Sequence, residues 1–154
     1  MDETTYIALS KDYMPALFRV ACSILGRATD AEDAVQQALI KAWLHREKAR
    51  PGAERAWMMR ILVNESRSLL RKRRDALPIE ELPLCAPSAP DTGLQEAIRA
   101  LPESLRTPLL LKYMEGLTEK EVAAAVGIPV SSVKGRLFRA RRMLKARLNE
   151  EVEP

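Results

Sequence analysis

Apolar residues recur at intervals of three and four along most of the chain, and no stretch alternates between apolar and polar residues as a half-buried strand would. This spacing, in segments rich in Leu, Ala, Arg, Glu and Lys, predicts α-helices throughout. We therefore expect an all-α protein. The expected helices cover approximately residues 4–25, 29–44 and 54–74, then a segment resuming near 94, and finally 102–115, 118–126 and 131–148.

Residues that begin and end helices divide these segments. Two capping boxes, which start at Thr29 (Thr-Asp-Ala-Glu) and at Thr118 (Thr-Glu-Lys-Glu), predict helix starts. Ser131 is expected to cap the last helix. A glycine at the end of a helical pattern predicts a stop at two places, Gly26 and Gly127. Pro15 should kink the first helix or mark a restart, because proline lacks an amide donor and clashes with the preceding turn.

Residues 75–93, DALPIEELPLCAPSAPDTG, separate the two groups of helices. Prolines disfavour helix and favour an extended chain, and the segment holds four of them, Pro78, Pro83, Pro87 and Pro90. We expect two small helical domains, residues 1–74 and 94–154, joined by an extended proline-rich linker. The linker is acidic, whereas both flanking segments carry more cations than acids. Such basic blocks suggest nucleic acid as a partner, although a solvated, highly charged surface explains the charge alone equally well.

The segment SSVKGRLFRARRMLKARL, which begins at Ser131, carries seven cations and no acid. Like charges three and four residues apart on a helix repel, so this composition predicts a polyanionic partner. A short capped helix and a turn precede the segment, which is the helix-turn-helix arrangement, and its second helix enters the major groove of DNA. On a helical wheel the apolar residues gather on one side, and the groove-facing side and its flanks carry Lys134, Gly135, Arg136, Phe138, Arg139 and Arg142. A basic helix on a membrane surface or in a coiled coil is the alternative, but neither needs the preceding capped helix.

A second basic helix, expected over residues 54–74, places its apolar residues on one side and a polar stripe on the other. The stripe holds Trp57, Arg60, Asn64, Arg67, Ser68 and Arg71. Cations, an amide and an aromatic ring on one side suit phosphate contacts together with readout of unstacked bases. The wheel leaves open whether Trp57 faces DNA or packs in the core, which is the more frequent fate of a tryptophan.

Together these segments resemble a bacterial RNA polymerase sigma factor of the extracytoplasmic-function group. TDAEDAVQQALIKAW is similar to the acidic helix of the second sigma region that docks on polymerase, and RAWMMRILVNESRSLLRKRR to the helix that opens and reads the minus-ten element. LPESLRTPLLLKYMEGLTEKEVAAAVGIPVSSVKGRLFRARRMLKARL is similar to the fourth region, which reads the minus-thirty-five element. The resemblance covers nearly the whole chain and implies three partners: core RNA polymerase, promoter DNA and an anti-sigma factor.

The resemblance also implies roles for individual residues. The polymerase-binding set would be Asp30, Glu32, Asp33, Gln36 and Gln37. The minus-ten set would be the polar stripe, with Asn64 and Ser68 nearest the DNA strand of the minus-ten element. A loop over residues 48–54 would help to hold a base extruded from that strand. Many family members carry an acid where Ser68 stands. The minus-thirty-five set would be Ser131, Ser132, Lys134, Gly135, Arg136, Phe138, Arg139 and Arg142.

The acidic linker suggests a further hypothesis. In the family the linker passes through channels of polymerase that nucleic acid uses, so its acids would mimic phosphates until RNA displaces them: Asp75, Glu80, Glu81 and Asp91. A merely soluble tether explains the same residues equally well.

Two other classes of function remain to be weighed. A helix-turn-helix regulator that acts without polymerase accounts for residues 94–148 but not for the acidic helix or the Asn64 stripe. An enzyme is disfavoured, because the one histidine, His45, lies at a helix end and no catalytic triad, metal-ligand spacing or glycine-rich phosphate loop is present. We expect no catalytic residue, no metal and no cofactor. No apolar run is long enough for a membrane span and no signal peptide is present, so we expect a cytoplasmic protein without membrane insertion.

Overall fold

The computed structural model describes residues 1–74 and 93–152, and the chain divides into two compact units, residues 1–85 and 86–154. All regular secondary structure in the described residues is helical, which confirms the all-α prediction. Most of the linker and its four acids, on which the phosphate-mimicry hypothesis depends, lie outside the described residues.

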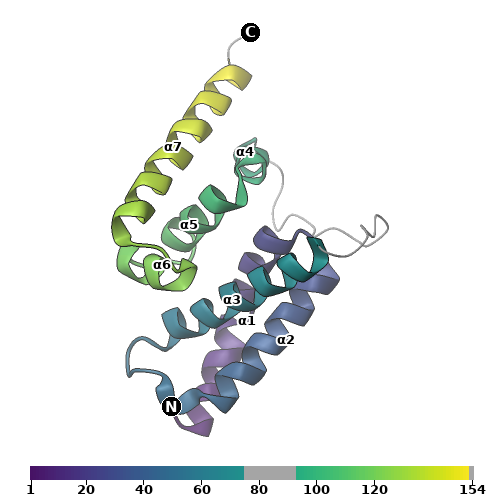
Figure 1. The fold of residues 1–154 in the computed structure, drawn as a ribbon, viewed down its shortest axis with the longest axis vertical. Coiled ribbons are helices and arrows are strands. Elements are labelled where there is room, and N and C mark those ends of the chain that lie inside the picture. Colours follow the sequence, from purple (N-terminus) through teal and green to yellow (C-terminus); the bar gives the residue numbers. More distant parts are fainter. Residues whose placement is uncertain (75–92, 153–154) are drawn as a thin grey trace. The chain divides into compact units, whose positions relative to one another are not determined.

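The first unit is a bundle of three long helices. These are α1 (Glu3–Leu25), α2 (Ala28–Leu44) and α3 (Glu54–Arg74), and each packs on the other two (Figure 1). A short 3-10 helix, η1 (Arg46–Lys48), lies in the connection between α2 and α3. The core combines large side chains of α1 and α3 with a stripe of small residues on α2, which are Ala31, Ala34, Val35, Ala38 and Ala42. Small side chains at a contact allow helix axes to approach closely, so α2 lies tight against its neighbours.

α1 ends at its predicted stop, Gly26, and passes through Pro15 without a break. The Asp2 carboxylate accepts a hydrogen bond from the Thr5 amide at 2.7 Å, and the helix stops at Gly26, whose φ is 77°. Of the two outcomes expected at Pro15, a kink or a restart, the restart does not occur. Pro15 is exposed, while Tyr13 and Ala16 beside it are buried. The missing hydrogen bond therefore falls on the solvent side, and packing on the inner side keeps the helix continuous.

The predicted capping box at Thr29 does not form. α2 begins at Ala28 with Arg27 as its N-cap residue, and no side chain caps it. Thr29 therefore lies inside the first turn. The Asp30 carboxylate, also in that turn, bonds instead to Arg73 of α3. An ion pair therefore links the first turn of α2 to α3, and no side chain caps that turn.

The second unit consists of α4 (Leu94–Ala100), α5 (Glu103–Tyr113), α6 (Glu119–Val126) and α7 (Val130–Val152), and α7 packs on the other three (Figure 1). The capping box at Thr118 is confirmed. The Thr118 hydroxyl accepts from the Glu121 amide at 3.1 Å, and the Glu121 carboxylate accepts from the Thr118 amide at 2.9 Å. Gly127 ends α6 as predicted.

Two details of this unit differ from the sequence prediction, and a third, at Pro108, agrees with it. α7 begins at Val130, so Ser131 lies in its first turn rather than capping it, and the Ser132 amide donates to the Pro129 carbonyl at 3.0 Å. Pro102 is the N-cap residue of α5 rather than part of its first turn. Pro108 is buried inside α5, which continues through it.

Arg106 joins α4 to α5. Its guanidinium donates to the carbonyls of Leu101 at 2.7 Å and Arg99 at 3.2 Å, which lie at the end of α4. Burial lowers the pKa of this guanidinium, and the charge of Glu103 opposes the shift. Arginine remains charged at any physiological pH. The bonds therefore act as a permanent cap for α4.

The two Thr-x-x-Glu sites give a matched test of the helix ends. Thr118→Ala removes a formed cap and should cost about 1 kcal/mol, whereas Thr29→Ala removes none and should be neutral or slightly stabilising. Amide hydrogen exchange of the full chain reports on the helices of each unit separately. Exchange from α6 should rise about fivefold in Thr118→Ala. Equal effects of the two substitutions on their own helices would contradict this assignment.

Candidate functional site

The outward side of α2 carries the polar residues of the predicted polymerase-binding set. Glu32, Asp33, Gln36 and Gln37 are all exposed, and the buried stripe of small residues occupies the other side of the helix. Four acids and amides on one open surface can bond donors of a partner without breaking any contact of the bundle. The structure therefore leaves this surface available for docking.

Two large apolar residues on the same helix were not predicted as site residues. Ile40 is 52% exposed and Leu44 is 62% exposed. With Asp33 and Gln37 they follow the spacing i, i+4, i+7, i+11, which places all four on one side of α2. The sequence did contain a signal, because both residues lie off the stripe of small residues that marks the buried side. An apolar centre with a polar rim is typical of a protein-binding surface.

Asp30 differs from the rest of its predicted set. Its carboxylate pairs with Nη1 of Arg73 at 2.6 Å, and its side chain is only 17% exposed. The pair links the first turn of α2 to the last turn of α3. We therefore regard Asp30 as a residue that ties two helices together, and its contact with polymerase remains an expectation that this bond disfavours.

The end of α2 is fixed by an aromatic group. The rings of Tyr6 and Trp43 meet edge to face with 5.1 Å between their centroids, and the Arg46 guanidinium lies 3.8 Å from the Trp43 centroid. The Tyr6 hydroxyl donates to the Leu39 carbonyl at 2.6 Å. These contacts hold the α2 end, where Leu44 lies, against α1.

α3 presents the polar stripe that the sequence predicted. Arg60, Asn64 and Arg71 are exposed, while the remaining members are half-buried, which are Trp57, Arg67 and Ser68. The opposite side of α3 is fully buried at Met58, Met59, Leu62 and Val63. Trp57, which the sequence left open between core and surface, is thus partly accessible.

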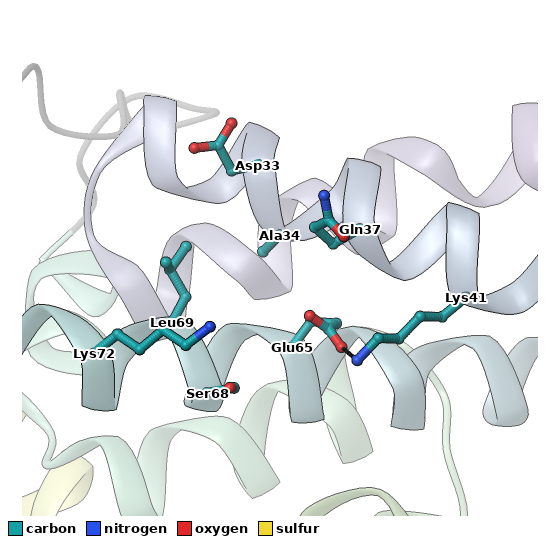
Figure 2. Close-up of a pocket in the computed structure, with 8 residues that line it drawn as sticks. All are labelled: Asp33, Ala34, Gln37, Lys41, Glu65, Ser68, Leu69 and Lys72. Carbon is teal, nitrogen blue, oxygen red and sulfur yellow. Dashed lines mark ion pairs between the residues drawn. The ribbon is translucent and has the colours of Figure 1, made fainter.

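A groove between α2 and α3 joins the two predicted surfaces. Figure 2 shows its lining residues, which are Asp33, Ala34, Gln37 and Lys41 of α2 and Glu65, Ser68, Leu69 and Lys72 of α3. An ion pair between Lys41 and Glu65 crosses from one helix to the other. Because Asp33 and Gln37 belong to one predicted set and Ser68 to the other, the two predicted surfaces are neighbours.

The loop before α3 is closed by its own residues. Gly52 has a φ of 85°, a conformation that favours glycine, and its amide donates to the Glu54 carboxylate at 2.9 Å. Bonds from the Glu54 and Gly52 amides hold the pKa of Glu54 below its usual value. The contact therefore persists at any pH above the usual pKa of a glutamate, and it is lost only as the pH falls through the lowered pKa of Glu54.

α7 turns its cations outward as the wheel predicted. Val133, Leu137 and Ala140 are fully buried on its inner side. The other side is open and includes Phe138, which is 54% exposed, together with Lys134, Arg139, Arg142 and Ser131. The Arg142 guanidinium lies 6.0 Å from the centre of the Phe138 ring, so an aromatic and a cation form one outward group.

Gly135 lies on this open side without any structural need for glycine. Its φ is not positive, and a Cβ built there would meet nothing within 4 Å. Glycine inside a helix costs about 0.5–1 kcal/mol relative to alanine. The fold does not explain this loss of stability. Close approach of a ligand to the backbone at Gly135 would explain it.

Arg136 and Ser132 are less open than the other members of the minus-thirty-five set. Both are half-buried, and Nη1 of Arg136 donates to the Ser104 carbonyl of α5 at 3.3 Å. This bond ties one side of α7 to the start of α5. The structure thus gives Arg136 an internal contact that the wheel did not predict.

Metal sites and membrane spans are both absent from the residues that the structure describes. Within 1–74 and 93–152 we find no group of three or more His, Cys, Asp or Glu side chains arranged to hold a metal ion. None of the helices described has the length and hydropathy required to span a membrane.

Comparison with known proteins identifies both units. A family model described as Sigma-70 region 2 matches residues 9–76, and one described as Sigma-70, region 4 matches residues 92–144. The chain is 30% identical over 147 residues to RNA polymerase sigma factor SigV of Bacillus subtilis, covering 91% of this chain and 89% of SigV. It is 27% identical to ECF RNA polymerase sigma factor SigE of Mycolicibacterium smegmatis, covering 89% of this chain but only 59% of that relative.

A solved structure shares the fold over almost the full length. It is the sigma factor RpoE from Bartonella quintana, crystallised in complex with the anti-sigma factor NepR. The TM-score is 0.76 at 28% sequence identity, and the match covers 96% of this chain and 99% of RpoE.

The Asp30–Arg73 pair predicts a stability difference within one helix. Asp30→Ala should lower the free energy of unfolding of the first unit by about 0.5–1 kcal/mol, because the pair is charge-assisted yet partly solvated. Asp33→Ala, the control on the exposed side of α2, should change it by less than about 0.5 kcal/mol. Both tryptophans, Trp43 and Trp57, lie in the first unit. Urea unfolding followed by tryptophan fluorescence therefore reports on this unit, and equal losses for the two variants would contradict the assignment.

Proposed function

Because the chain belongs to the extracytoplasmic-function (ECF) group of the sigma-70 family, we propose that it binds core RNA polymerase and directs promoter recognition and DNA melting at the start of transcription. One observation carries the proposal. Regions 2 and 4 occur in order on one chain, and each presents its own cation-rich helix with a buried apolar side. The chain supplies recognition, and RNA synthesis belongs to the polymerase.

We assign polymerase binding to the outward side of α2. Its centre is the apolar pair Ile40 and Leu44, and its rim is polar, with Asp33, Gln36 and Gln37. Burial of exposed apolar surface gives most of the affinity in such interfaces, while charged and amide groups set orientation. Asp30 stays outside this surface because Arg73 occupies its carboxylate.

We assign recognition of the minus-ten element to the α3 stripe. Melting exposes bases that an exposed amide such as Asn64 can bond, and Arg60 and Arg71 can neutralise the phosphates beside them. The loop that Glu54 closes on Gly52 lies at the start of the same helix and is the proposed place for an extruded base.

We assign the minus-thirty-five element to α7. Its exposed side has the composition of a major-groove reader, with arginines that can bond guanine and an aromatic ring that can contact the thymine methyl group. Gly135 would let the backbone approach the base edges. The residues of this surface are Ser131, Lys134, Gly135, Phe138, Arg139 and Arg142.

A regulator that binds DNA without polymerase is the other candidate, and it is not favoured. It would use α6 and α7 but give no role to region 2, which matches residues 9–76. Regulation through a protein partner fits the sigma factor better, because the related RpoE was solved with its anti-sigma factor. We therefore include an anti-sigma factor among the partners, and the cytoplasm, where transcription takes place, as the location.

Transcription in vitro tests the proposal directly. Core polymerase on a library of promoter sequences should initiate at a restricted set when the full chain is added, and those sequences should share two elements separated by a fixed spacing. The run without the chain is the control. If polymerase neither takes up the chain nor changes its start sites, the proposal is rejected, however well the chain binds DNA.

Substitutions on the two units should separate the two activities. Asp33→Arg and Ile40→Ser should each weaken polymerase binding by about tenfold, since one reverses a rim charge and the other removes a central apolar contact. Arg139→Glu should leave that affinity unchanged and reduce promoter use. Fluorescence anisotropy of the labelled chain, titrated with core polymerase, measures the first quantity, and run-off transcription at saturating sigma measures the second. Parallel defects in both assays for all three variants would show that the surfaces are assigned wrongly.

A further inference from the structure

A tyrosine and an arginine on the second unit form a hydrogen-bonded pair that the proposed function does not use. Nη1 of Arg141, on α7, donates to the hydroxyl of Tyr113, the last residue of α5, at 2.6 Å. Tyr113 is 56% exposed and Arg141 is exposed. The bond therefore lies at the surface, where neither burial nor core packing accounts for it.

The Tyr113 hydroxyl is a neutral partner, whereas two other arginines of the described residues pair with acids. Arg73 and Arg147 pair with carboxylates, those of Asp30 and Glu96, so their charges are compensated within the unit. The Tyr113 hydroxyl orients the Arg141 guanidinium but leaves its positive charge uncompensated. A guanidinium has five N–H donors, and this bond uses one of them.

The position of Arg141 places it beside the surface assigned to DNA. On the α7 wheel it lies with Lys134 and Lys145 in a row within about 40°, next to the outward side that carries Phe138 and Arg142. Lys134 and Lys145 are also exposed. A row of cations beside a groove-reading surface is where the phosphates of a DNA strand would pass.

The opposite flank of α7 gives the contrast. There Arg136 is half-buried and donates to a backbone carbonyl, that of Ser104, so it fastens α7 to the start of α5. Arg141 is fastened near the end of α5, but through an exposed side chain. One flank therefore serves packing, and the other holds an oriented cation at the surface.

We propose that Tyr113 is a positioning residue for DNA binding, which holds Arg141 so that its remaining N–H groups bond a phosphate next to the minus-thirty-five element. This proposal rests on the proposed function of α7. A side chain that is already oriented loses less conformational freedom on binding. Because the contact is to phosphate, it raises affinity for every sequence alike and carries no base preference.

The test uses full-length variants assembled with core polymerase on duplex DNA that carries the minus-thirty-five element, over a range of KCl concentrations. Arg141→Ala should lower affinity about tenfold and reduce the slope of log K against log salt by about 0.9, the value for one phosphate contact. Tyr113→Phe keeps the ring and removes the hydroxyl, and it should lower affinity about threefold. The double variant should match Arg141→Ala alone, because Tyr113 acts only through Arg141.

Two controls separate this role from a structural one. Tyr6→Phe removes a hydroxyl that donates to the Leu39 carbonyl in the first unit, and it should leave affinity and salt slope for this DNA unchanged. Hydrogen exchange of α5 and α7 should be the same in Tyr113→Phe as in the parent chain. Both results support the proposal.

Three outcomes would overturn it. The first is that Tyr113→Phe binds as tightly as the parent chain, the second that the two substitutions weaken binding additively, and the third that the loss depends on the base sequence of the element. Failure of the proposed function itself would appear at the assembly step, because core polymerase would then not bind the parent chain. The DNA affinities of the variants would not be compared in that case.

Discussion

Burial of one apolar stripe on each cation-rich helix is the interaction on which the rest of the structure depends. On α7, Val133 and Leu137 are fully buried, and burying such a side chain stabilises by about 1.5–3 kcal/mol. A pair of like charges three or four residues apart costs about 0.2–0.5 kcal/mol, and α7 contains Arg136–Arg139, Arg139–Arg142, Arg141–Lys145 and Arg142–Lys145. Burial therefore outweighs repulsion, and it fixes which side of the helix the cations occupy.

The charged side chains then divide into those that hold the fold and those that remain open. Asp30 and Arg73 tie α2 to α3, and Arg106 caps α4 through two carbonyls. Arg139 and Lys134 lie on the exposed side of α7. Net charge alone does not distinguish these classes. The distinction depends on which carbonyl or carboxylate from another helix comes within reach, so it is a property of the tertiary structure.

Sequence patterns predicted the ranges of the helices better than the way in which the first turn of each helix is capped. Periodicity placed α3 at residues 54–74, and Gly26 and Gly127 stop α1 and α6 as expected. The capping box was right at Thr118 and wrong at Thr29, although both have the same spacing of Thr and Glu. At Thr29 the helix begins one residue earlier, at Ala28, so the threonine lies inside the first turn and cannot act as the N-cap. The neighbouring Asp30 carboxylate bonds to Arg73 of α3, a contact that no local pattern encodes. Ile40 and Leu44 were not predicted for a different reason: bulky apolar residues usually lie in the core, whereas these two lie off the buried stripe of small residues and are exposed.

The tight α2–α3 contact explains how one docking event can position a second surface. α2 meets its neighbours through alanines and a valine, and ion pairs link it to α3 at two places, Asp30 with Arg73 and Lys41 with Glu65. Residues that pack this closely move together, because a dense interior leaves little room for sliding. If polymerase holds the outward side of α2, Asn64 and Ser68 of α3 are placed at a fixed offset from it. In the proposed function, the position of the minus-ten surface on polymerase then follows from docking alone, without a change of fold in the first unit.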